Sequence, residues 1–117
     1  MSDAARILAI RHGETAWNVD TRIQGQLDVG LNDTGRWQAG RLAQALSGEA
    51  LGAIYASDLG RAHHTALAIS RVTGVVIISE PGLRERHFGE FQGKTFVEIE
   101  TALPEQARLW RTRDPGF

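Results

Sequence analysis

The fold is decided by the stretch Ile7-Leu8-Ala9-Ile10-Arg11-His12-Gly13-Glu14-Thr15 near the N-terminus. Its first four residues are apolar and flanked by polar ones, which predicts a short buried strand at residues 7–10. Residues 11–32 then turn polar and contain glycine without a sustained period, which predicts a long functional loop. The sequence therefore places a histidine, between an arginine and a glycine, where the first strand ends.

The rest of the chain alternates between helix and strand signals. Strands separated by helices favour βαβ units and a parallel sheet, whose functional loops lie beyond the carboxyl ends of the strands. The loop at residues 11–12 and the segment 57–61 are thus expected to be neighbours. We expect strands at 53–56 and 75–78 and a turn at 114–116. The first expected helix runs from caps at 32–34 to a stop at Gly48, and the second is capped by Ser57 or Asp58 and ended by Gly74. Two more helices are expected, one with a capping box at Thr95 and Glu98 and one from Pro104 towards Trp110.

Composition predicts one small cytoplasmic globular domain. The chain has 117 residues, 13 basic and 14 acidic side chains, a formal net charge of -1 and no cysteine. This charge balance indicates neither a nucleic-acid partner nor an anionic membrane surface, and the lack of cysteine excludes disulfides and thiolate metal sites. We also expect no targeting peptide and no membrane span.

The residues around His12 are those that a phosphate site needs. Arg11 and Arg61 can neutralise a phosphate dianion through bidentate hydrogen bonds, and amides at the start of the helix beginning near Arg61 favour an anion. Further donors are available from Thr15, Asn18 and the amide of Gly25. An imidazole nitrogen in line with phosphorus could then form a phosphohistidine.

These motifs resemble the signature of the histidine phosphatase superfamily, also called phosphoglycerate mutase-like. The resemblance runs in order through three blocks that cover nearly the whole chain. They are Arg11-His12-Gly13-Glu14-Thr15 with Trp17-Asn18, Gln24-Gly25, Asp28, Leu31 and Gly35; Ser57-Asp58-Leu59-Gly60-Arg61-Ala62 with Thr65-Ala66; and Leu83-Arg84-Glu85-Arg86-His87-Phe88-Gly89 with Gly93.

The resemblance implies a role for each matching position. His12 matches the nucleophile of the family, and Arg11 and Arg61 match its phosphate-binding arginines. Glu85 matches the proton donor to the leaving alcohol, which burial beside a dianion would keep protonated; alternatively, Glu85 forms a plain surface ion pair with Arg84 or Arg86. The positions expected around the substrate are Thr15, Asn18, Gln24 and Gly25.

The sequence departs from the family in one respect. Family members use a second histidine, in a downstream Ser/Thr-His-Gly block, and the chain contains no such block; His63, His64 and His87 do not match it. The resemblance therefore implies that residues 1–117 form the N-terminal part of a single α/β/α three-layer domain with a mostly parallel sheet, truncated before its C-terminal half. We expect slow turnover at most, or completion by a second copy in a homo-oligomer.

Three functions remain open. The segment Gly89-Glu90-Phe91-Gln92-Gly93-Lys94-Thr95 favours hydrolysis of a small phosphorylated substrate, without cofactor or metal. The alternatives are a phosphoglycerate mutase that depends on 2,3-bisphosphoglycerate, and a phosphate-binding module without turnover. A metal hydrolase is disfavoured. His12 and Glu14 are two residues apart on the loop, but no further cluster of carboxylates or histidines completes a set of metal ligands.

Overall fold

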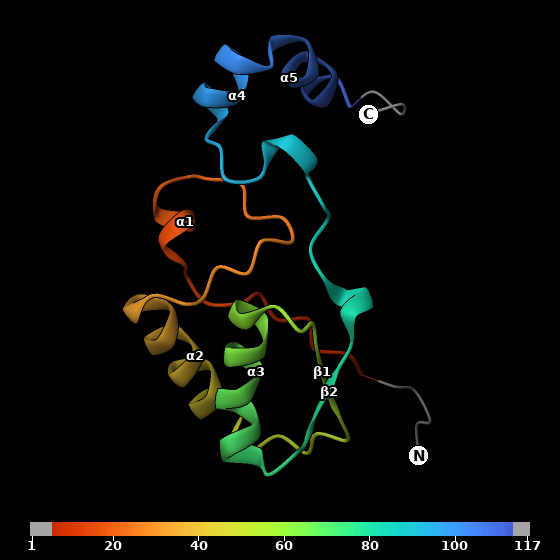
Figure 1. The fold of residues 1–117 in the computed structure, drawn as a ribbon. Coiled ribbons are helices and arrows are strands. Elements are labelled where there is room, and N and C mark those ends of the chain that lie inside the picture. The colour runs from red at the N-terminus through yellow and green to blue at the C-terminus, as the bar shows by residue number, and fades with distance from the viewer. Residues whose placement is uncertain (1–5, 114–117) are drawn as a thin grey trace.

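The computed structural model describes residues 6–113 (Figure 1). Two of its elements are strands, β1 (Ile54–Ala56) and β2 (Ile77–Ser79). The helices are α1 (Ala16–Val19), α2 (Asp33–Leu46), α3 (Gly60–Thr73), α4 (Phe96–Ala102) and α5 (Pro104–Arg111), and short 3-10 turns lie at Pro81–Leu83 and Gly89–Phe91.

The two strands are parallel and joined through α3, as expected of a βαβ unit. Ile54 pairs with Ile77 and Ala56 with Ser79. Within β1, Ile54 and Ala56 are buried and Tyr55 is exposed, because successive side chains point to opposite faces of a sheet. Helix α3 packs against both strands, and α2 packs against α3 (Figure 1). Their common core contains the buried residues Ala43, Ile54, Ala56, Ala66 and Ile69.

A second, separate core lies under the C-terminal helices. Phe91, Ile99 and Ala107 are buried there, with Ile23 and Trp110 packed against them. The indole of Trp110 stacks on the ring of Phe96 at 5.1 Å and lies 5.0 Å from the tilted ring of Phe91. Because Ile23 belongs to the loop after His12, this aromatic core fixes one side of that loop to α4 and α5.

Most helix ends follow the local signals. Asn32 caps α2 by accepting a 2.7 Å hydrogen bond from the amide of Gly35, and Gly74 ends α3 in the left-handed conformation with φ 75°. Thr95 forms the expected capping box with Glu98 at the start of α4, and Pro104 occupies the first turn of α5. Helix α2 ends at Leu46, close to the expected stop at Gly48.

The cap predicted for α3 is wrong. Its N-cap is Leu59, which makes no side-chain cap bond. The carboxylate of Asp28, from the distant loop, instead accepts the amide hydrogen of Gly60 at 2.6 Å. Asp58 is engaged elsewhere, in a bidentate ion pair with Arg84. A tertiary contact therefore replaces the local cap.

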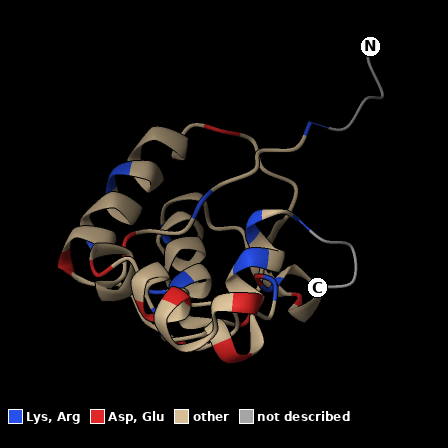
Figure 2. Cartoon of the chain, turned by 90° about the horizontal axis from the view of Figure 1, so that it is seen from above, with Lys and Arg blue, Asp and Glu red and all other residues tan. Residues whose placement is uncertain are grey.

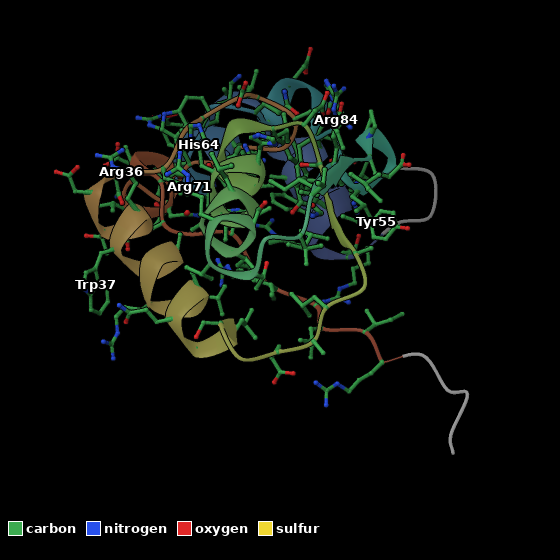
Figure 3. The ribbon with its side chains drawn as sticks, turned by 90° about the horizontal axis from the view of Figure 1, so that it is seen from below. Arg36, Trp37, Tyr55, His64, Arg71 and Arg84 are labelled. Carbon is green, nitrogen blue, oxygen red and sulfur yellow. The ribbon has the colours of Figure 1, made fainter. Side chains whose placement is uncertain are left out.

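Three further expectations about the sheet are corrected in whole or in part. Residues 7–10 form no strand, since within residues 6–113 no backbone segment pairs with them, and Ile7 is 87% exposed. The strand expected at 75–78 lies at Ile77–Ser79. The three-layer prediction is also only partly met: α3 covers one face of the two strands, while Tyr55 points away from it on the other (Figure 3). Apolar sequence alone cannot form a strand; hydrogen-bonding partners must be present.

Two features of the surface bear on function. Basic and acidic residues both occur along the helices (Figure 2), in keeping with the net charge of -1. Among residues 6–113, no helix is long and apolar enough to cross a membrane. The turn predicted at 114–116 lies outside the described residues.

The loop after residue 10 crosses the start of α2 at two glycines. A Cβ atom on Gly13 would lie 2.4 Å from the carbonyl oxygen of Gly35, and one on Gly35 would lie 2.0 Å from that of Glu14. Both distances are too short for any side chain. The absence of Cβ atoms therefore lets the loop carrying His12 lie directly on α2.

The substitution Gly35→Ala should destabilise the fold by roughly 1–3 kcal/mol, because the new methyl group meets backbone that cannot move independently. Gly40, in the same helix, is the matched control, since nothing lies within 4 Å of a Cβ built there. Gly40→Ala should stabilise the fold by about 0.5–1 kcal/mol through helix propensity. Urea denaturation followed by circular dichroism measures both, and an equal shift in the two variants would refute the close approach.

Candidate active site

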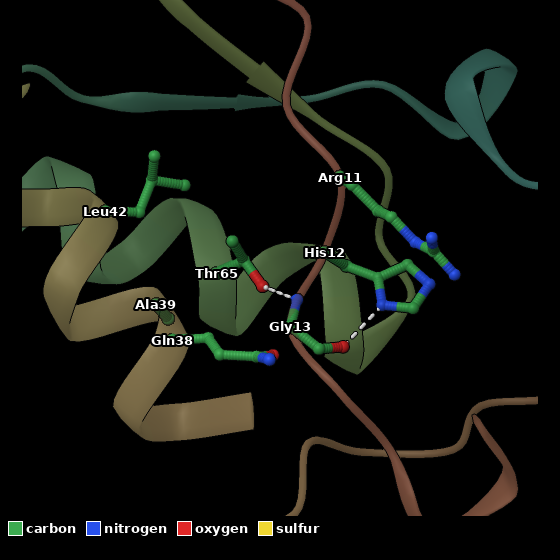
Figure 4. A pocket seen from close by; sticks show the side chains of 7 residues that line it. All are labelled: Arg11, His12, Gly13, Gln38, Ala39, Leu42 and Thr65. Carbon is green, nitrogen blue, oxygen red and sulfur yellow. Dashed lines mark hydrogen bonds between the residues drawn. The ribbon is translucent and has the colours of Figure 1, made fainter. Parts of the chain in front are cut away.

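His12 lies in the loop between residue 10 and α1 and is half-buried. Its Nδ1 atom is 2.6 Å from the carbonyl oxygen of Gly13 (Figure 4). A carbonyl can only accept, so this contact requires the proton to be on Nδ1. The other ring nitrogen, Nε2, then carries the lone pair in the neutral imidazole. The backbone thereby selects the tautomer with a nucleophilic Nε2.

The surroundings of His12 favour its neutral form. Burial is the largest effect and lowers the pKa of the imidazole below its ordinary value, and the positive charges of Arg61 and Arg11 lower it further. The bond to Gly13 and the charge of Glu85 oppose this shift. Because the net direction is downward, the lone pair on Nε2 is available at neutral pH.

Arg61 is buried, although it carries a charge. The side chain is 2% exposed, and its two terminal nitrogens donate hydrogen bonds to the carbonyl oxygens of Leu27, at 2.6 Å, and Gly25, at 2.5 Å. Burial lowers the pKa of this guanidinium, whereas the charges of Glu85 and Asp28 raise it. Arg61 therefore fastens the loop to α3 and places positive charge near His12.

Arg11 and Glu85 differ from Arg61 in being exposed. The guanidinium of Arg11 extends on the same side of the chain as the imidazole of His12 (Figure 4). Glu85 lies in the loop after β2, where its carboxylate accepts the amide hydrogen of Arg86 at 2.9 Å. It is close enough to influence the pKa of both His12 and Arg61. Its burial beside a bound dianion remains a prediction. Its predicted alternative partner Arg84 pairs with Asp58 instead.

The residues expected around the substrate mostly contact one another. Thr15 is fully buried, caps α1, and donates a 2.7 Å hydrogen bond to the side-chain oxygen of Gln24. Asn18 accepts the amide hydrogen of Thr15 at 3.0 Å. Gly25 has φ 53°, and its carbonyl faces Arg61. This geometry gives Thr15 and Gln24 a structural role in shaping the loop; contact of the four residues with substrate remains a prediction.

A pocket of about 220 Å³ adjoins His12. It lies between the loop and helices α2 and α3, and Figure 4 shows Ala39, Leu42 and Thr65 on the opposite side of the chain from the imidazole. Arg11 and His12 line its edge. The imidazole itself points away from this apolar side of the chain (Figure 4). The imidazole of His12 and the apolar side of the pocket thus lie on opposite sides of the chain.

Three contacts of the site were not predicted from sequence. Asp28 caps α3, Arg84 pairs with Asp58 across the loops that follow β1 and β2, and Thr65 accepts the amide hydrogen of Gly13 at 3.0 Å. Asp28, Arg84 and Thr65 all fall inside the motif blocks that carry the family resemblance. That position in the motifs was the one sequence signal that pointed to them. Their partners are 26 to 52 residues away in sequence, so spacing could not reveal the pairing.

The described residues supply groups suited to anion chemistry. Within residues 6–113, no group of three histidine, aspartate or glutamate side chains could hold a metal ion. A neutral imidazole with an oriented lone pair, two guanidinium groups and a nearby carboxyl group are brought together instead. Such a set can bind a phosphate monoester and transfer its phosphoryl group to nitrogen.

Comparisons with known proteins point to one family. The family model of the histidine phosphatase superfamily (branch 1) matches residues 7–117. The chain is 47% identical over 105 residues to phosphoglycerate mutase-like protein 4 of Arabidopsis thaliana, covering 88% of this chain and 46% of that protein. It is 41% identical over 108 residues to glucosyl-3-phosphoglycerate phosphatase of Mycobacterium tuberculosis, covering 92% and 48%.

The fold is likewise similar to solved structures. A mycobacterial glucosyl-3-phosphoglycerate phosphatase in complex with inorganic phosphate superimposes with a TM-score of 0.75 at 39% identity, covering 86% of this chain and 46% of that one. The described residues thus adopt part of the phosphoglycerate mutase-like fold. The chain spans about half the length of the curated relatives it matches.

The lowered pKa of His12 predicts how stability responds to acid. An unfolded chain binds a proton at this histidine near pH 6.5, whereas the folded chain binds it only at lower pH. Stability should therefore decrease as the pH falls from about 6.5 through the pKa of folded His12. The carboxyl groups with lowered pKa, such as those of Asp58 and Glu98, act in a separate, more acidic range.

Urea midpoints measured between pH 7.5 and pH 5 test this expectation against His12→Asn, which stays neutral throughout. The variant should lose less stability over that range than the original chain. Proton NMR titration should place the pKa of His12 below 6.5, and a value above 6.5 would contradict the assigned surroundings.

Proposed function

The chain belongs to the histidine phosphatase superfamily (branch 1), and from this premise we propose that it takes part in hydrolysis of a phosphomonoester through a phosphohistidine on His12. The supporting observation is the 2.6 Å contact between Nδ1 of His12 and the carbonyl oxygen of Gly13, which leaves the lone pair on Nε2. The positive charges of Arg11 and Arg61 lie near enough to His12 to lower its pKa.

In the proposed first step, the arginines attract the dianion and Nε2 of His12 attacks phosphorus. The N–P bond forms as the P–O bond to the substrate alcohol breaks, and Glu85 supplies the proton that the leaving alkoxide requires. In the second step, water attacks the phosphohistidine and gives a proton back to Glu85. Inorganic phosphate leaves, and neutral His12 is regenerated.

The proposed role of Glu85 carries one requirement. A proton donor must hold its proton until the alcohol leaves. A bound phosphate dianion would disfavour the ionised form through like-charge repulsion. We therefore expect Glu85 to become a proton donor only when substrate is present.

The substrate is proposed to be a small phosphorylated metabolite. Relatives carry the names of glucosyl-3-phosphoglycerate phosphatase and metal-independent phosphoserine phosphatase, and one has been crystallised with inorganic phosphate. The segment 89–95 favours a phosphatase over a mutase. The mutase remains the second candidate because the Arabidopsis relative at 47% identity is named phosphoglycerate mutase-like.

The phosphohistidine can be tested by labelling the chain with a radioactive phosphoryl donor. We expect an acid-labile, base-stable label on the original chain that His12→Ala abolishes. His64→Ala is the matched control, since His64 is an exposed histidine on α3, and it should keep the label. Phosphorus NMR should locate the phosphoryl group on Nε2, and a label on Nδ1 would contradict the tautomer.

Two substrate assays separate the candidate functions. Release of phosphate from p-nitrophenyl phosphate, with no isomerisation of 3-phosphoglycerate in the presence of 2,3-bisphosphoglycerate, would favour the phosphatase. The reverse result would favour the mutase. Binding of inorganic phosphate without any label would indicate a phosphate-binding module, which would overturn the proposed function.

A further inference from the structure

We propose that Thr65 is a positioning residue for His12, holding the peptide of Gly13 so that the imidazole keeps its tautomer and its place near Arg61. The inference rests on the proposed function, since it concerns the same nucleophile. It is carried by a continuous set of hydrogen bonds that joins α3 to the ring of His12.

The set begins on α3. The hydroxyl of Thr65 donates to the carbonyl oxygen of Arg61, one helical turn earlier, at 2.7 Å. A hydroxyl has a single hydrogen, so this bond leaves its oxygen as an acceptor. That oxygen accepts the amide hydrogen of Gly13 at 3.0 Å (Figure 4). The direction of each bond is therefore fixed by the one before it.

The next bond reaches the imidazole. The carbonyl oxygen of Gly13 accepts the proton on Nδ1 of His12 at 2.6 Å. Thr65 thus holds the N–H side of Gly13, and the C=O side of the same residue holds the ring. A shift of Gly13 would change the orientation of the imidazole and the nitrogen that carries its proton.

Burial makes the position of Thr65 sensitive. Thr65 is 4% exposed and Gly13 is also buried, so water cannot easily replace the hydroxyl as a partner for the amide. On its other side, Gly13 meets the backbone of Gly35. If the hydroxyl were removed, the loop would have to move before the amide of Gly13 could find another hydrogen-bond partner. Because the backbone of Gly35 blocks the other side, the loop could move only away from both helices.

The test compares Thr65→Val, which keeps the shape of the side chain but lacks the hydroxyl, with Thr65→Ser, which keeps the hydroxyl. Thr73→Val is the matched control: Thr73 lies on the same helix and donates to the carbonyl of Ile69, four residues earlier, at 2.8 Å, but it is far along α3 from His12. The three variants therefore separate the link to Gly13 from the loss of a helical hydroxyl.

The readouts are the rate of phosphoryl labelling and the pKa of His12 by NMR titration. Thr65→Val should slow labelling by about tenfold to a hundredfold, because a displaced reacting group loses most of its alignment. The pKa of His12 should rise towards its ordinary value as the ring moves out of its buried place. Thr65→Ser should restore both quantities to near their original values, and Thr73→Val should change neither.

Unchanged labelling in folded Thr65→Val would overturn the inference, as would an unchanged His12 pKa where the original chain takes no label, or equal slowing by Thr73→Val. Should Thr65→Val fail to fold, the same comparison is made with Thr65→Ala in the Gly40→Ala background, whose added helix stability offsets part of the loss.

The proposed function can fail separately. If the original chain takes no label, the NMR titration still decides on Thr65, because the pKa of His12 does not depend on catalysis. If the original chain is labelled and Thr65→Val is labelled at the same rate, the result supports the proposed function and refutes the positioning role of Thr65.

Discussion

The site depends on a buried positive charge, the guanidinium of Arg61. A charge in the protein interior is costly unless it is hydrogen-bonded, and here two carbonyl groups of the preceding loop accept its hydrogens. The same bonds bring the loop onto α3. The charge then lies close to His12, where burial lowers the pKa of the imidazole and the charge lowers it further, and where it would attract an anion. One interaction thus shapes the loop and sets the electrostatics of the site.

The loop is held from both sides by different means. On the side of the strands, the loop packs directly against α2 at Gly13 and Gly35, where no side chain would fit. It also donates a hydrogen bond to the hydroxyl of Thr65 on α3. Towards the C-terminus, Ile23 packs into the aromatic core around Trp110, and the amide of Ile23 donates to the carbonyl of Lys94 at 3.0 Å. A loop with little regular structure is therefore kept in one conformation by its neighbours.

Sequence reasoning succeeded where the signal is local. Caps at Asn32 and Thr95, the glycine stop at Gly74 and the proline start at Pro104 all appear as expected, because each depends on residues within one helical turn. It failed at residues 7–10, where apolar side chains suggested a strand but the backbone finds no partner within residues 6–113. It failed again at the start of α3, where the cap comes from Asp28.

The sequence by itself determined the chemistry: a histidine between an arginine and a glycine after an apolar run, a second arginine at a helix start, and the family to which these motifs belong. Only the tertiary structure decided which imidazole nitrogen of His12 carries the proton, that Arg61 is buried under loop carbonyls, and that Thr15 and Gln24 face each other. The physical reason is that residue types specify what a group can donate or accept, whereas its actual partners are set by packing between segments far apart in the chain.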